Sequence, residues 1–367
     1  MKTIDIGTLL ITPAHIKQVV KALKSNRLSY GPMTDEFEKK FSQKHGYKYG
    51  IFANSGTSAL QATIHAMKIL YGWKDGDEII MPATTFVATY NVILHNNLKP
   101  VLVDIGKDFN IDPYLIEEKI TKRTRAIMPV NLLGKPCDMR RINKIAKKYN
   151  LKVIADSCET MGVDIGKAEV ACFSFYIAHL LVTGVGGMAI TNNKKFADLI
   201  RSLIFHGRDN LYLKIDDDDK YSEKVIHSRF KFNHPGYSYR GTEVEGALGL
   251  VELDLLDKNI KKRQQNAHYL NSKLNIWNED YMSNHAFMMF PILSQSRNEL
   301  MLHLEKAGIT TRTIMPLINQ PYIKANLRDY PYSNFVLKTG LLIGCHQDLT
   351  QKDLDYIIKQ VQIYGSL

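Results

Sequence analysis

The chain has 367 residues, with 48 Lys plus Arg against 37 Asp plus Glu, which gives a formal net charge of +11 and a pI near 9.2. A hydrophobic content of 45% is typical of a folded globular protein and argues against a disordered basic tail. No run of about eighteen apolar residues and no signal-peptide pattern occurs, so we expect no membrane-spanning helix and a cytoplasmic setting. The length predicts one large domain with an appendage, or two to three ordinary domains.

The Lys and Arg residues are dispersed along the chain, and no helix-turn-helix or basic arm is evident. We therefore expect no nucleic-acid partner, while attraction of an anionic substrate and plain solubility both remain open as explanations of the charge. The cysteines lie far apart, with neither CxxC pairing nor zinc-ligand spacing, so we expect no disulfide framework and no metal site. They are Cys137, Cys158, Cys172 and Cys345.

From about residue 50 the sequence alternates between helix-like and strand-like segments. Residues 58–70 place apolar side chains on one helical face, and residues 138–149 predict a helix with one basic face. Short apolar segments predict strands at residues 77–82, 100–104, 125–130, 151–156, 170–175 and 187–191. This alternation predicts a mostly parallel central sheet with helices on both faces, in which ligands bind at the carboxyl ends of the strands.

The composition changes near residue 208. Residues 208–236, which include four consecutive aspartates, show neither helix nor strand periodicity and predict a long loop. Helical periodicity returns at residues 244–274. The remainder predicts a smaller α+β unit with one strand and two helices, at residues 287–292, 298–307 and 352–363. We therefore divide the chain into a large domain at residues 1–240, with an N-terminal arm, and a small C-terminal α+β domain at residues 241–367.

Four polar stretches follow predicted strands, so a parallel sheet would present them at one edge. The first, residues 54–59, offers backbone N–H groups and hydroxyls to a phosphate, although an ordinary Ser/Thr helix cap is the simpler interpretation of this stretch alone. The second, residues 82–88, carries Phe86, which either stacks on a planar ring or belongs to the core.

The third stretch is residues 156–162. A carboxylate at the carboxyl end of a buried strand is costly unless it is paired, so Asp156 requires a partner such as a protonated pyridine nitrogen, or else it caps a helix. In the fourth stretch, residues 173–187, Ser174 and His179 lie five residues apart before a glycine-rich turn. A single His with apolar neighbours is most often a core residue, and the order and spacing of all four stretches favour a functional site.

These motifs and one more occur in a fixed order: NSGTSAL, PATTFVAT, ADSCETMG, SFYIAHLLVTGVGG and GYSYRGTEVEGALGL. Over nearly the whole chain they resemble the sugar aminotransferase family named for DegT, DnrJ, EryC1 and StrS. The resemblance implies the α/β fold type I of enzymes that depend on pyridoxal 5′-phosphate (PLP), and a homodimer with the active site at its interface. Most members act on nucleotide-linked keto-sugars, and glutamate is the expected amino donor.

The resemblance also implies which residues bind the cofactor. Gly56, Thr57 and Ser174 would bind its phosphate. Phe86 would stack on the pyridine ring, and Asp156 would keep the ring nitrogen protonated, which makes the ring an electron sink.

His179 is the main departure from the family pattern. The aminotransferases have Lys at this position and hold the cofactor covalently through it, which an imidazole cannot do. The resting form would then be the amine, pyridoxamine 5′-phosphate (PMP), held by non-covalent contacts. Imidazole remains a competent base, because its reference pKa of about 6.5 lies near neutral pH.

Other positions depart from the family pattern as well. Glu159 stands where the aminotransferases usually have Gln or His against the cofactor. Ser238 stands where the family's Asn reaches the cofactor phosphate of the partner subunit, and Asn233 is the alternative residue for that contact. Arg208 would meet a substrate phosphate.

The replacement of Lys by His resembles one branch of the family, the 3-dehydratases of 4-keto-6-deoxy nucleotide sugars. In that branch the histidine removes a proton from the cofactor, and the C3 hydroxyl of the sugar is expelled. Some members also carry an iron–sulfur cluster, which the scattered cysteines disfavour. The alternatives are a sugar aminotransferase, including a Lys-to-His variant that traps its substrate, and a non-catalytic homologue that binds cofactor or sugar.

Overall fold

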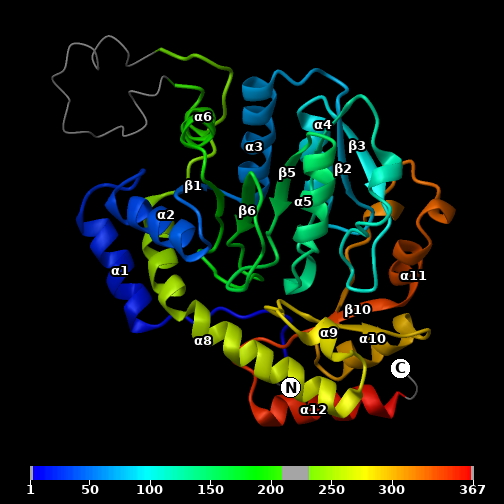
Figure 1. Ribbon diagram of the computed structural model, residues 1–367. Helices are drawn as coiled ribbons and strands as arrows, with labels where there is room; N and C mark the ends of the chain where they lie inside the picture. Colours follow the sequence, from blue (N-terminus) through cyan, green and yellow to red (C-terminus); the bar gives the residue numbers. More distant parts are fainter. Residues whose placement is uncertain (1–2, 209–230, 365–367) are drawn as a thin grey trace.

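The computed structural model describes residues 3–208 and 231–364, so most of the predicted loop at 208–236 lies outside the described residues. A central sheet of seven strands forms the larger part (Figure 1). Its strands are β1 (Tyr49–Ala53), β2 (Glu78–Pro82), β3 (Lys99–Val103), β4 (Thr124–Ile127), β5 (Lys152–Asp156), β6 (Val170–Ser174) and β7 (Gly187–Thr191).

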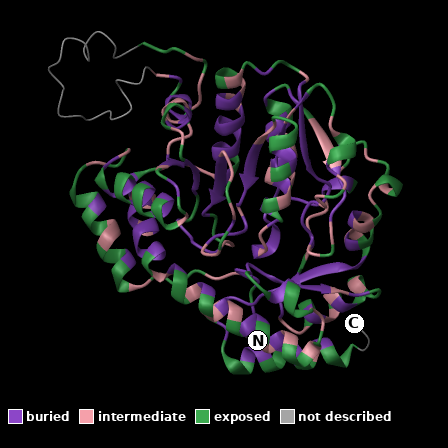
Figure 2. Ribbon diagram, in the orientation of Figure 1, coloured by how far each residue is buried: buried purple, intermediate pink, exposed green. Residues whose placement is uncertain are grey.

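The strand order is β1-β7-β6-β5-β4-β2-β3. Strand β7 runs antiparallel to both of its neighbours, and every other neighbouring pair is parallel. The predicted mostly parallel sheet is therefore confirmed, and β2 to β7 coincide with the predicted segments to within three residues at each end. Except for the edge strand β3, which is mostly half-buried, the strands are almost entirely buried (Figure 2), so they appear in the sequence as continuous apolar runs rather than as alternating patterns.

Helices cover both faces of the central sheet. On one face Ile79, Met81 and Ile154 pack in a core with α3 (Gly56–Tyr71), α4 (Val87–His95) and α6 (Lys194–Ile204). On the other face Ile80 and Val153 pack against α5 (Met139–Lys148), and Phe52, Ala171 and Phe173 pack with α2 (Pro32–Lys44) and α8 (Glu243–Leu274). Successive residues of a strand thus point to opposite faces of the sheet, as the period of two in a strand requires.

The small C-terminal part is built on a three-stranded antiparallel sheet in the order β8-β10-β9. The strands are β8 (Phe290–Leu293), β9 (Arg312–Thr313) and β10 (Gly340–Ile343), and the helices around them are α9 (Glu279–Met282), α10 (Arg297–Lys306), α11 (Pro331–Thr339) and α12 (Gln351–Ile363). The predicted helices at 298–307 and 352–363 correspond to α10 and α12. Strands β9 and β10 were not predicted.

Helix α8 joins the two parts, and the N-terminal helix α1 (Pro13–Lys24) packs along it (Figure 1). Helix α8 begins with a capping box, in which the side chains of Thr242 and Glu245 accept hydrogen bonds from each other's backbone N–H groups. It ends at Asn275, which has the left-handed conformation. No helix within residues 3–208 and 231–364 is both long and apolar enough to cross a lipid bilayer.

Asp104, which follows β3, fixes the small sheet against the large one. Its buried carboxylate accepts hydrogen bonds from the N–H groups of Tyr332 and Ser333, both at 2.8 Å, and from the Ser333 hydroxyl at 2.6 Å. These groups form the first turn of α11, where backbone N–H groups have no partner within the helix. A single carboxylate therefore caps α11 from the other sheet.

The ion pair between Glu38 and Arg201 joins α2, α6 and β1. Arg201 donates to both carboxylate oxygens, at 2.9 and 2.6 Å, while the N–H of Phe52 donates to the same carboxylate at 2.6 Å. Glu38 is 3% exposed, so the pair is removed from water. Removing one partner of such a pair leaves the other charged and buried without compensation.

We expect Glu38→Gln to lower the free energy of unfolding by about 3–5 kcal/mol, measured by urea denaturation. The matched control is Glu36→Ala, which removes the exposed pair of Glu36 with Lys40 on the same helix and should cost less than about 1 kcal/mol. Equal losses in the two variants would contradict the structural role assigned to Glu38.

Candidate active site

The loops that follow β1, β2, β5 and β6 meet at one edge of the central sheet and line a cavity of about 500 Å³. The small C-terminal part also lines the cavity, through Arg312 of β9, Leu342 of β10 and Met288, which precedes β8. The cavity brings together most of the site residues predicted from the sequence: Gly56, Thr57, Phe86, Asp156, Glu159, Ser174 and His179.

Gly56 and Thr57 open helix α3 on the cavity wall. Ser55 caps the helix and accepts a hydrogen bond from the N–H of Ser58 at 3.0 Å, so the chain enters the helix in an extended conformation just before Gly56. A Cβ atom at Gly56 would lie 2.8 Å from both the Sγ of Cys158 and the Cβ of Ser174, which is too close. Only glycine allows these three segments to meet, and the start of α3 then faces the cavity as an anion-binding helix end.

Asp156 lies at the carboxyl end of β5 and is 4% exposed. One of its oxygens accepts from the N–H of Cys158 at 3.1 Å, and the other accepts from the hydroxyl of Thr89 at 2.8 Å. Burial raises the pKa of Asp156, since no Lys, Arg or His among the described residues forms an ion pair with it. The carboxylate is therefore under-compensated in the protein alone and is suited to a cationic ligand group.

Thr85 and Thr89 are site residues that the sequence analysis missed. The Oγ1 of Thr89 donates its proton to Asp156, so the 2.9 Å contact between the two threonine hydroxyls requires Thr85 to donate to Thr89. The two threonines thereby orient the carboxylate. The threonines of PATTFVAT, at its fourth and last positions, were a signal for them, because buried hydroxyls near a strand end need partners.

Glu159 lines the same cavity from the turn after Asp156 and is 6% exposed. It accepts a hydrogen bond from the N–H of Leu133 at 2.8 Å. Burial, followed by the nearby negative charge of Asp156, raises the pKa of Glu159 to about 7. Near neutral pH this side chain can therefore either donate or accept a hydrogen bond within the cavity.

The imidazole of His179 lines the cavity from the loop between β6 and β7. Its Nδ1 lies 3.3 Å from the carbonyl oxygen of Tyr176. A carbonyl only accepts, so Nδ1 carries the proton and Nε2 keeps its lone pair. Burial lowers the pKa of His179 to about 4, which keeps the ring neutral at physiological pH. A neutral imidazole in this tautomer is ready to act as a base.

Three predicted residues do not line this cavity. Asn233 donates its backbone N–H to the carbonyl of Gly207, and the exposed Ser238 accepts from the guanidinium of Arg240 at 2.9 Å. Arg208 stacks its guanidinium over the ring of Phe232, with 5.7 Å to the ring centroid. Within one chain, these residues lie apart from the cavity that holds His179.

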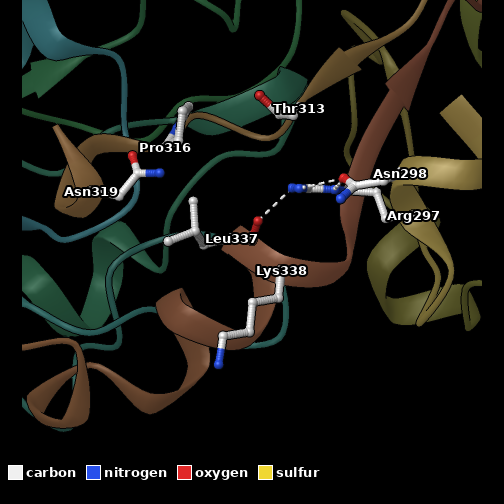
Figure 3. Close-up of a pocket in the computed structure, with 7 residues that line it drawn as sticks. All are labelled: Arg297, Asn298, Thr313, Pro316, Asn319, Leu337 and Lys338. Carbon is white, nitrogen blue, oxygen red and sulfur yellow. Dashed lines mark hydrogen bonds between the residues drawn. The ribbon is translucent and has the colours of Figure 1, made fainter. Parts of the chain in front are cut away.

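Arg312 of β9 is the one Lys or Arg side chain among the described residues that line the cavity. This residue was not predicted from the sequence, because a two-residue strand has no periodicity. The neighbouring Thr313 also lines a second pocket of about 470 Å³ (Figure 3). There the guanidinium of Arg297 is already bonded to the carbonyl of Leu337, at 2.5 Å, and to Asn298. None of the residues that line this second pocket is a predicted site residue.

Comparisons with known proteins match residues 10–362 to the DegT/DnrJ/EryC1/StrS aminotransferase family. A GDP-perosamine synthase of Caulobacter vibrioides is 32% identical over 351 residues, which cover 90% of this chain and 89% of that protein. The solved structure of E. coli GDP-4-keto-6-deoxy-D-mannose-3-dehydratase with bound hydrated PLP is 26% identical, with a TM-score of 0.89, and covers 99% of this chain and 100% of that chain.

A second solved structure, of GDP-4-keto-6-deoxymannose-3-dehydratase with a trapped PLP-glutamate geminal diamine, is 25% identical with a TM-score of 0.88 and covers 97% of this chain and 99% of that chain. The chain therefore belongs to the DegT/DnrJ/EryC1/StrS aminotransferase family. It has the PLP fold type I that the order of its motifs predicted.

We expect the imidazole of His179 to titrate with a pKa of about 4 and to be protonated at Nδ1 in the neutral form. Histidine-labelled protein, with the resonance assigned from His179→Asn, gives both values by NMR over a pH series. A pKa at or above the reference of about 6.5, or a proton at Nε2 in the neutral form, would contradict the geometry described here.

Proposed function

We propose, starting from this family membership, that the chain binds PLP and PMP and removes the C3 hydroxyl of a 4-keto-6-deoxy nucleotide sugar, with His179 as the base. The observation that carries the proposal is the imidazole of His179 in the cavity, with its Nδ1 bonded to the carbonyl of Tyr176, at the position where aminotransferases of the family have Lys. The E. coli 3-dehydratase shares the fold over the whole chain, which supports this assignment.

The cavity fits the cofactor. The buried carboxylate of Asp156, bonded only to a hydroxyl and an N–H, matches a protonated ring nitrogen. The glycine-opened end of α3, with Gly56, Thr57 and the adjacent Ser174, matches the phosphate. Phe86 would lie against the ring, and Glu159 would complete the contacts. The bound cofactor would supply a conjugated ring that takes up the electrons left when a proton is removed from the cofactor and passes them on toward the sugar.

His179 would then move a proton at Nε2. It cannot attach the cofactor covalently, so non-covalent contacts alone would hold the cofactor in the cavity. Glutamate, which appears in the structure of the related dehydratase, is the proposed donor that restores the amine form.

A homodimer is part of the proposal. Asn233 and Ser238 lie outside the cavity of their own chain, which supports a position for this segment at the cofactor of a partner subunit. Arg208 also lies apart from the cavity of its own chain. In the proposed dimer it would contact a substrate phosphate at the active site of the partner subunit. The cytoplasmic setting and the domain boundary at residue 240 remain predictions.

Transamination is the second candidate, because the GDP-perosamine synthase is more similar in sequence than the dehydratase of known structure. A non-catalytic protein that binds cofactor or sugar is the third.

We expect PMP-loaded protein, given 4-keto-6-deoxy nucleotide sugars, to form a product that has lost one oxygen and kept its ketone, with PMP oxidised to PLP and its nitrogen released as ammonia. Mass spectrometry and cofactor absorbance measure both. His179→Asn should lower the rate by about 10²–10⁴-fold with cofactor binding retained. A 4-amino sugar as the product would favour the second candidate, and tight cofactor binding with no product across the sugar panel would favour the third.

We expect Arg312→Gln to raise KM for the nucleotide sugar, because it removes the cation of the cavity wall, while PMP affinity stays unchanged. A charge-assisted hydrogen bond is worth about 1.5–3 kcal/mol, so KM should rise about 10–100-fold. The matched control is Arg140→Gln on the exposed face of α5, which should behave as the wild type. Loss of PMP binding in Arg312→Gln would instead assign Arg312 to the cofactor.

A further inference from the structure

The small C-terminal part lines the cofactor cavity with a group of apolar side chains. They are Met288, Met289, Met315 and Leu342, which we call the apolar wall. Met315 is half-buried and Met289 is 5% exposed, whereas Met288 and Leu342 are 2% and 0% exposed. Met315, and to a smaller extent Met289, therefore offer the surface that a ligand in the cavity meets, and the other two are packed in the core.

The apolar wall is fixed in place by backbone contacts. The N–H of Met288 donates to the carbonyl of Leu133 in the large part at 3.0 Å, and its own carbonyl accepts from the buried guanidinium of Arg263 at 3.0 Å. Leu342 of β10 pairs directly with Arg312 of β9, so their side chains lie on the same face of the small sheet. The wall and the cation of Arg312 thus keep a fixed relation to each other.

The apolar wall is left for the substrate. Every residue proposed to bind the cofactor, from Gly56 to Ser174, belongs to the large part, and the small part adds Arg312 and Thr313 as its polar side chains. Of the substituents on a 4-keto-6-deoxy nucleotide sugar, the hydroxyls, the ketone and the diphosphate are polar, and the methyl group on C5 is the one apolar substituent. Thioether and isobutyl groups suit that methyl group and give a hydroxyl no good hydrogen-bond partner.

We propose that the apolar wall determines specificity at C6: it contacts the methyl group of a 6-deoxy sugar and discriminates against a sugar that carries a hydroxyl there. A hydroxyl against the wall would lose its bonds to water without replacement. Apolar pockets reject an added hydroxyl by up to about 10²-fold, so the expected preference for the 6-deoxy sugar is about 10–100-fold. This inference rests on the proposed function, because it assigns the sugar to this cavity.

The first test measures binding without turnover. GDP-D-rhamnose and GDP-D-mannose differ only in the hydroxyl at C6, and neither has the ketone that the reaction needs. Calorimetry of PMP-loaded protein with this pair, and with UDP- and dTDP-linked 6-deoxyglucose and glucose, covers three nucleotides. The 6-deoxy member of a pair that binds should bind about 10–100-fold more tightly. Equal affinities within each pair, or no binding of any pair, would overturn the proposal.

Variants of Met315 connect the preference to the apolar wall. Met315→Gln keeps the length of the side chain and adds an amide for the C6 hydroxyl, so the preference should fall about 3–10-fold, the effect of one hydrogen bond. Met315→Leu is the matched apolar control and should keep the preference. Thr313→Val removes the neighbouring hydroxyl and should also keep it. A preference that survives in Met315→Gln, or that changes in Thr313→Val, would contradict the assignment.

A second measurement uses the wild-type chain and does not depend on the folding of Met315→Gln. Protein labelled with ¹³C in the methionine methyl groups, with the Met315 signal assigned from Met315→Leu, is mixed with the 6-deoxy sugar of the pair that binds. A nuclear Overhauser effect should connect the methyl group of Met315 with the C6 methyl group of the sugar. Its absence in the saturated complex would overturn the proposal.

Dehydration assays separate this inference from the proposed function. In PMP-loaded protein, kcat/KM should be higher for 4-keto sugars without the C6 hydroxyl than for those with it, by the same factor as in binding. A preference in binding with no dehydration in any assay would reject the proposed function and keep the role of the apolar wall. Dehydration with equal kcat/KM for the two kinds of sugar would reject the specificity inference alone.

Discussion

The buried carboxylate of Asp156 is the constraint on which the site depends. It ends a central strand of a sheet that is covered on both faces, where an ionised group without a charged partner is costly. The protein supplies one N–H and one hydroxyl, and Thr85 in turn orients the hydroxyl of Thr89. That arrangement holds the carboxylate in place without neutralising it. The compensating positive charge is left to a ligand, which is why the cavity suits a cationic ring.

The position of His179 follows from the one antiparallel strand of the central sheet. Because β7 runs back beside β6, the loop between them must leave and return at the same edge, next to Asp156. Hydrogen bonds of Phe175 with Gly186 and Thr183 close the base of this loop. The loop then brings its histidine to the wall of the cavity, and the carbonyl of Tyr176 sets the tautomer. The order of the strands thus determines where His179 lies, and the carbonyl of Tyr176 determines which of its ring nitrogens carries the proton.

Much of the fold and part of the site could be predicted from the sequence for identifiable reasons. Buried parallel strands appear as short apolar runs, and the loops after them form motifs whose order pointed to a shared edge, so Asp156 and His179 were found. Arg312 was missed because a two-residue strand leaves no pattern, and Thr89 because its role depends on a contact 67 residues away in sequence. Asn233, Ser238 and Arg208 do not line the cavity of their own chain, and their roles remain predictions that depend on the proposed homodimer.

The net positive charge of the chain is high, but almost none of its Lys and Arg side chains line the cavity. Of the 48 Lys and Arg residues, Arg312 alone lines the cavity, within the part of the chain that the structure describes. The net charge of +11 can therefore raise the rate of encounter with an anionic nucleotide sugar over the whole surface, an effect that salt screens. It cannot by itself orient that substrate. In the proposed function Arg312 of the small sheet contributes to that orientation, and Asp104 links the small C-terminal part to the large sheet through the first turn of α11.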